Sequence, residues 1–182
     1  MEAYEFSNHV LDLGDPSQLI IAIKQTREVI QESVAKLKGQ GYTNFGFIGS
    51  SLGSFIIYNC LAVLPELKWG IINTGGEVAD AVWSDKVMRK PYEANGYTKE
   101  NLQNAWSDIQ YPDLGDLKGK NLLLITSISD EIVGYEGAIK CFDYIKSAGP
   151  NVEVQVHKRL GHRKTVLRNL LRLRKLVRRV DL

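Results

Sequence analysis

The sequence is poor in the residues from which disulfide frameworks and metal centres are built. It holds 2 cysteines and 3 histidines in 182 residues, and they do not have the spacing of a metal site. Cys60 and Cys141 each lie among apolar neighbours in a predicted helix, so we expect two buried free thiols. These shortages exclude a disulfide-stapled secreted scaffold and a zinc-binding module.

Long apolar runs are also absent. No stretch approaches the roughly 20 residues that cross a bilayer, and the start Met-Glu-Ala-Tyr-Glu has neither the basic nor the apolar part of a signal peptide. We therefore expect no integral membrane segment and a cytoplasmic location. A hydrophobic fraction of 44% beside 24% charged residues fits a single globular domain over residues 1–182.

The most informative segment is Gly49-Ser50-Ser51-Leu52-Gly53. It follows a strand-like run and precedes a buried helix, the context of a nucleophile elbow whose sharp turn exposes the central side chain, here Ser51. Gly49 and Gly53 are expected to be required because a Cβ at either would collide with the neighbouring strand or helix. The segment lacks the lysine of a Walker A phosphate loop. The alternative is a serine in an ordinary tight turn.

Two further residues complete a constellation with Ser51. Asp130 follows the apolar run 121–127, and His162 follows the strand-like run 152–157. A hydroxyl needs a base to become a nucleophile, an imidazole titrates near neutrality, and a carboxylate can orient that imidazole. Ser51, Asp130 and His162 supply these groups in that chain order.

Each of these residues also has a structural alternative. Asp130 could cap a helix that begins near Ile132, and His162 could be a cap or a surface residue before the last helix. The remaining histidines, His9 and His157, are expected to have structural or surface roles. Three coincidences at the ends of three strands favour a shared function over separate structural roles.

From residue 42 to the last helix the chain resembles the α/β-hydrolase superfamily. The resemblance rests on Gly-Ser-Ser-Leu-Gly, Leu-Leu-Leu-Ile-Thr-Ser-Ile-Ser-Asp-Glu-Ile-Val and Leu-Gly-His. It implies that Ser51 is the nucleophile, Asp130 the acid and His162 the base. It also implies that the backbone N–H of Leu52 donates to the oxyanion, and that no cofactor is needed.

The N-terminal part departs from this resemblance. An oxyanion hole needs a second amide, usually from a loop after an earlier strand, and no such strand and loop can be identified. Residues 1–15 resemble the stretch that follows that loop, so we expect two or three opening strands to be lacking and part of the sheet to be uncovered. A truncated or degenerate protein that binds a ligand or partner without turnover is therefore the alternative to an enzyme.

The rest of the pattern predicts an α/β fold, with a mostly parallel sheet and helices on both faces. Strands are expected near Phe45 and over 69–73, 121–127 and 152–157. Helices are expected over 16–38 and near the positions Phe55, Glu136 and Leu167. Gly39 and Gly41 are expected to end the first of these helices.

The segment 75–120 is a long insertion between two predicted strands. It carries five aromatic residues: Trp83, Tyr92, Tyr97, Trp106 and Tyr111. Hydrolases of the superfamily often place a cap there that shapes the acyl pocket. The alternative is that the aromatic residues pack a small helical excursion onto the core.

The last predicted helix is strongly basic. Eight of the 23 lysines and arginines lie in residues 163–179, in a chain of net charge +2, so the rest of the chain is net negative. A basic amphipathic helix can make a peripheral contact with an anionic membrane. The favoured interpretation is a core-facing stripe of leucines with solvated arginines. Nucleic-acid binding is not expected, because no recognition motif accompanies the charge.

Together these features predict a serine hydrolase that cleaves a carboxylic ester or a related small-molecule acyl substrate. Thioester, acyl-transfer and peptide chemistry stay open, because one triad serves them all.

Overall fold

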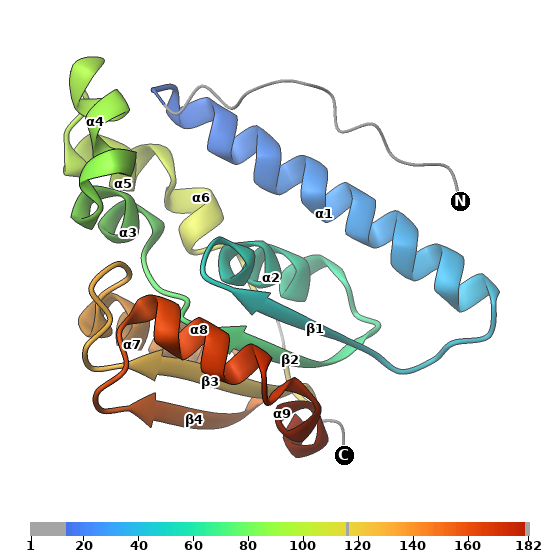
Figure 1. Cartoon of the computed structure of the whole chain (residues 1–182). Helices are drawn as coiled ribbons and strands as arrows, with labels where there is room; N and C mark the ends of the chain where they lie inside the picture. The colour runs from blue at the N-terminus through green and yellow to red at the C-terminus, as the bar shows by residue number, and fades with distance from the viewer. Residues whose placement is uncertain (1–13, 116, 181–182) are drawn as a thin grey trace.

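Four parallel strands form the centre of the computed structural model, which describes residues 14–115 and 117–180 (Figure 1). The strands are β1 (Phe45–Ser50), β2 (Leu67–Asn73), β3 (Asn121–Ser127) and β4 (Asn151–His157). They lie side by side in chain order and all run parallel. Their carboxyl ends therefore meet at one edge of the sheet, as the sequence pattern predicts.

Helices connect the strands and follow the last one. They are α1 (Pro16–Gly39), α2 (Leu52–Val63), α3 (Val78–Ser84), α4 (Lys86–Ala94), α5 (Lys99–Ala105), α6 (Ser107–Gln110), α7 (Tyr135–Ser147), α8 (His162–Leu170) and α9 (Leu173–Val180). The end of α1 at Gly39, followed by Gly41 with a φ of +91°, confirms the predicted stop.

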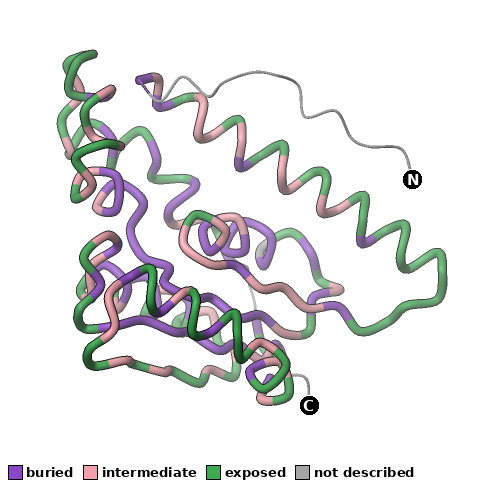
Figure 2. Tube along the Cα trace, viewed as in Figure 1, coloured by how far each residue is buried: buried purple, intermediate pink, exposed green. Residues whose placement is uncertain are grey.

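The central strands are covered on both faces, as predicted, whereas the outer strand β4 is largely exposed, with Val154 and Val156 37% and 38% exposed. Leu122 and Leu124 of β3 point into a large core with α1, α2 and α7, whereas Leu123 and Ile125 point to the other face and pack with α9. This alternation is the period of two expected of a strand buried on both sides. Figure 2 shows the central strands largely buried and the outer side of α1 exposed.

The structure corrects the prediction of one basic C-terminal helix with core-facing leucines. The chain breaks between α8 and α9, and Leu167 and Leu171 are 59% and 80% exposed. The inner face of α8 is instead polar and includes the buried residues Thr165 and Asn169. Leu176 on α9 faces the core as expected.

The insertion 75–120 forms the four short helices α3 to α6, which lie together beyond one end of the sheet (Figure 1). Tyr92 and Trp106 are buried in the main core, with their rings edge to face at 5.4 Å. The Trp106 indole N–H donates to the carbonyl of Pro16, which ties the insertion to the start of α1. These two aromatic residues therefore pack the insertion onto the core.

Two expectations concern the ends of the chain. His9 and most of the N-terminal stretch 1–15 lie outside the described residues. Within the described part, β1 pairs only with β2 and forms one edge of the sheet. No helix in that part of the chain is long and apolar enough to span a bilayer.

Candidate active site

The chain turns sharply between β1 and α2 at Ser51. Ser51 has a φ of 54° and a ψ of −121°, a region that non-glycine residues rarely occupy. Its backbone N–H donates to the carbonyl of Asn73 at the end of the neighbouring strand, at 3.0 Å. The turn is thus held against β2, and Leu52 begins the helix directly behind it.

Gly49 and Gly53 contribute unequally to this turn. A Cβ at Gly49 would lie 2.3 Å from the carbonyl oxygen of Gly53, so no side chain fits there. A Cβ at Gly53 would meet no atom within 4 Å, which contradicts the prediction of a collision. The two glycines approach with the backbone of Gly53 facing Gly49, so only Gly49 must lack a side chain.

The side chains of Ser51, His162 and Asp130 form a continuous hydrogen-bonded chain. His162 Nδ1 lies 2.9 and 3.0 Å from the two carboxylate oxygens of Asp130. His162 Nε2 lies 3.0 Å from Ser51 Oγ. A carboxylate can only accept, so the Nδ1–H donates to it, and in the neutral imidazole Nε2 is left to accept from the hydroxyl of Ser51.

The Asp130 carboxylate is held in its charged form although it is buried. Burial raises the pKa of Asp130, but hydrogen bonds from His162 and from the backbone N–H groups of Val133 and Ile132 outweigh it and hold the pKa below its ordinary value. Asp130 does not cap the following helix, because α7 begins only after Gly134. It caps the turn that leads to that helix instead.

The first turn of α8 fixes His162. The residue is 5% exposed, which excludes a surface role. Its backbone N–H donates to a carboxylate oxygen of Glu131 at 2.9 Å, where a negative charge also complements the helix N-terminus. Gly161 sits so close to this carboxylate that a Cβ would lie 2.7 Å from it. His162 is therefore held at its ring by Asp130 and at its backbone N–H by Glu131.

Two buried asparagines connect the turn at Ser51 to helix α8. Asn169 on α8 donates to the side-chain oxygen of Asn73 at 2.8 Å, and Asn73 donates to the hydroxyl of Ser50 at 3.0 Å. Both asparagines are at most 3% exposed. This pair was not predicted from the sequence, although this face of α8 is marked by polar residues at helical spacing: His162, Thr165 and Asn169.

The N-terminus of α2 lies directly behind Ser51. The amide of Leu52 is the first of α2, and the helix itself supplies no partner for the first amides of its N-terminus. This amide and the helix dipole favour negative charge beside Ser51. The described residues give no loop that corresponds to the second oxyanion donor expected from the resemblance.

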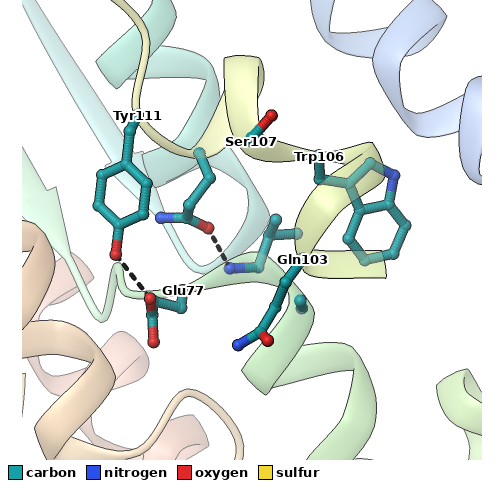
Figure 3. A pocket seen from close by; sticks show the side chains of 8 residues that line it. Glu77, Gln103, Trp106, Ser107 and Tyr111 are labelled. Atoms are coloured by element: carbon teal, nitrogen blue, oxygen red, sulfur yellow. Dashed lines mark hydrogen bonds between the residues drawn. The ribbon is translucent and has the colours of Figure 1, made fainter. Parts of the chain in front are cut away.

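A small cavity of about 160 Å³ lies between α3, α5 and α6, apart from the three hydrogen-bonded residues. Tyr111 lines this cavity, and its hydroxyl donates to the carboxylate of Glu77 at 2.6 Å (Figure 3). Glu77 also pairs with Lys140 at 3.2 Å. Glu77, Gln110 and Tyr111 already have hydrogen-bond partners within the protein. Ligand pockets are usually larger than about 300 Å³, so we interpret the cavity as a packing space around the insertion.

Neither cysteine has the properties of a reactive thiol. Burial raises the pKa of the Cys60 thiol to about 11 and that of Cys141 to about 12, so both stay protonated at neutral pH. Within residues 14–115 and 117–180, no group of three or more His, Cys, Asp or Glu side chains is arranged to hold a metal ion.

Residues 24–178 match the prolyl oligopeptidase family. The chain belongs to the prolyl oligopeptidase family. Its members are hydrolases of the esterase and peptidase type within the α/β-hydrolase superfamily, so the resemblance seen in the sequence is confirmed. No curated protein sequence matches the chain.

Several solved structures share the fold of this chain. The esterase Pf2001 of Pyrococcus furiosus is 16% identical, has a TM-score of 0.54 and matches 92% of this chain and 63% of its own. SOBER1 of Arabidopsis thaliana is 19% identical with a TM-score of 0.50, over 89% and 66% of the two chains. The acylaminoacyl peptidase of Pyrococcus horikoshii is 17% identical with a TM-score of 0.52, over 82% and 26%. The chain thus spans less than two thirds of each relative, and at these identities the likeness establishes the fold.

Proposed function

We propose that the protein is a serine hydrolase that cleaves a carboxylic ester or a related small-molecule acyl substrate. The observation that carries the proposal is the bridging position of His162, with one ring nitrogen at the Asp130 carboxylate and the other at the Ser51 hydroxyl. Membership of a hydrolase family supports the same chemistry. An esterase and an acylaminoacyl peptidase among the proteins of the same fold support an acyl substrate.

In the proposed reaction, Ser51 Oγ attacks the acyl carbon while His162 Nε2 takes the hydroxyl proton. Asp130 stabilises the imidazolium that forms and keeps the ring oriented. The amide of Leu52 donates to the oxyanion of the tetrahedral intermediate, together with a second donor that the described residues do not identify. His162 then returns its proton to the leaving group, and a water molecule activated by the same residue releases the acyl group.

Substrate hydrolysis by matched variants tests this proposal. We expect the purified protein to release p-nitrophenol from p-nitrophenyl acetate, and Ser51→Ala and His162→Ala to abolish the release. Ser33→Ala is the matched control, because Ser33 is an exposed serine on α1 whose hydroxyl bonds only to its own helix. A folded protein that hydrolyses no ester, thioester or peptide substrate would favour a noncatalytic protein of this fold that binds a ligand or partner.

A further inference from the structure

The exposed residues of α8, α9 and the turn between them include three leucines and seven cations, and we call this set the basic leucine surface. Its leucines are Leu167, Leu170 and Leu171, which are 59%, 47% and 80% exposed. Its exposed cations are Arg163, Lys164, Arg168, Arg172, Arg174, Lys175 and Arg178. Figure 1 shows α8 lying across the front of the sheet, with α9 beside its far end.

The leucines form one face of the helix and cannot turn inward. Leu167, Leu170 and Leu171 are spaced three and four residues apart, so they lie together on one side. The opposite side of α8 carries His162 and Asn169, which bond to Ser51 and to Asn73. Rolling the helix to bury the leucines would break both connections. The fold therefore keeps an apolar strip in solvent.

The exposed cations of this surface have no close acidic partners within the part of the chain that the structure describes. Among the described residues, none of the seven cations of the surface takes part in an ion pair; the neighbouring Arg179 does, with Glu153. Arg163, Lys164 and Arg168 lie three or four residues from Leu167 or Leu171, so positive charge borders the leucines on α8 itself. The surface is complementary to a partner that offers many negative charges and an apolar layer beneath them.

We propose that the basic leucine surface docks on a bilayer rich in anionic phospholipid. The cations would lie at the headgroups while the leucines enter the acyl boundary, the arrangement of interfacial helices. A second copy of the chain is disfavoured because a symmetric contact would bring like charges together. Nucleic acid is disfavoured because the centre of the surface is leucine, with no aromatic or polar reader of bases. The inference does not depend on the proposed hydrolase activity.

His162, the first residue of α8, faces Ser51 on the inner side of the helix. The leucines of the basic leucine surface face solvent on the outer side. Docking through these leucines therefore leaves the contact between His162 and Ser51 undisturbed.

Vesicle co-sedimentation tests the proposal with the full chain. We expect binding to phosphatidylcholine vesicles that contain phosphatidylglycerol, no binding to phosphatidylcholine alone, and weaker binding as salt is raised. Leu167→Gln with Leu171→Gln, and separately Arg168→Gln with Arg172→Gln, should each weaken binding by at least about tenfold. Lys24→Gln with Lys36→Gln removes the same charge from exposed positions on α1 and should leave binding unchanged.

Three results would overturn the proposal. The first is that the protein does not sediment with anionic vesicles although its circular dichroism spectrum shows that it is folded. The second is binding that the leucine substitutions leave unchanged, since charge alone would then explain it. The third is tighter binding to an RNA or DNA oligonucleotide than to anionic vesicles, measured at the same salt concentration.

Discussion

Ser51 at the end of β1 and Thr74 just after β2 both have a positive φ, of 54° and 57°. Such a conformation costs roughly 1–3 kcal/mol at a non-glycine residue. The hydroxyl of Thr74 donates to the adjacent carbonyl of Asn73 at 2.6 Å, and the residue is fully buried. The hydroxyl of Ser51 faces His162 instead. The two turns share a backbone strain and differ in what their hydroxyls contact.

This difference shows that backbone strain alone does not mark a reactive residue. At Thr74 the turn satisfies its own polar groups, with the backbone N–H donating to Ile125 and the hydroxyl to Asn73. At Ser51 the turn presents the hydroxyl to the imidazole of His162, which comes from a helix far along the chain. We therefore expect the hydroxyl of Ser51, which faces His162, to be reactive and the hydroxyl of Thr74, which donates to a backbone carbonyl, to be unreactive.

The largest expected effect is the difference in kcat between variants that lack the hydroxyl of Ser51 and variants that lack the hydroxyl of Thr74. Ser51→Ala should lower kcat for ester hydrolysis by about 10⁶, the scale seen when a catalytic nucleophile is removed. Thr74→Ala removes a hydroxyl from the other turn with a positive φ and should leave kcat within about tenfold. Steady-state hydrolysis of p-nitrophenyl acetate measures both. Similar losses of kcat in the two variants would mean that activity depends on intact turns and not on the hydroxyl that faces His162.

The next effect concerns the carboxylate behind His162. Asp130→Asn keeps the size of the side chain but removes the charge that accepts the Nδ1–H, so we expect kcat to fall by about 10⁴. Glu131→Gln changes the neighbouring carboxylate, which among the described residues bonds to the backbone N–H of His162 and not to its ring, and should cost far less. Equal losses in the two variants would contradict the assignment of Asp130.

A smaller effect sharpens the account of the β1 turn. Gly49→Ala should lower the free energy of unfolding by about 2–3 kcal/mol, because its Cβ would overlap the backbone of Gly53. Gly53→Ala meets open space in a helix and should raise that free energy by up to about 1 kcal/mol. Urea titration followed by circular dichroism compares them. Equal destabilisation would restore the expectation that both glycines are required.

The smallest effect tests whether the two turns are equally strained. Ser51→Gly should be about 1 kcal/mol more stable than Ser51→Ala, because glycine adopts a positive φ without strain. Thr74→Gly should likewise be more stable than Thr74→Ala, by a similar free energy of unfolding. Thermal unfolding of the four variants gives the two differences. A gain at one position and none at the other would show that the strain is not shared.

The sheet and the meeting point of its strand ends could be predicted from the sequence. Buried parallel strands read as continuous apolar runs, as in 121–127, and residues that follow such strands collect at one edge of the sheet. The proximity of Ser51, Asp130 and His162 follows from that rule. Their catalytic roles stay a proposal until activity is measured.

The rotation of α8 could not be predicted in the same way. Its leucines recur at helical spacing, which usually indicates a buried face. The buried side was decided instead by two long-range contacts, from His162 to Ser51 and from Asn169 to Asn73. Such contacts depend on how the helix docks on the sheet, and local periodicity carries no information about them. The sequence likewise could not predict that Gly49 must lack a side chain while Gly53 need not, because this depends on how the two residues approach each other in the folded turn.

The central claim is that His162 activates Ser51, and covalent labelling tests it most directly. A fluorophosphonate probe adds to an activated serine, and mass spectrometry of the peptides locates the adduct. The account predicts one adduct, at Ser51, that is lost in both Ser51→Ala and His162→Ala and retained in Thr74→Ala. An unlabelled but folded protein, or labelling that persists in His162→Ala, would contradict it.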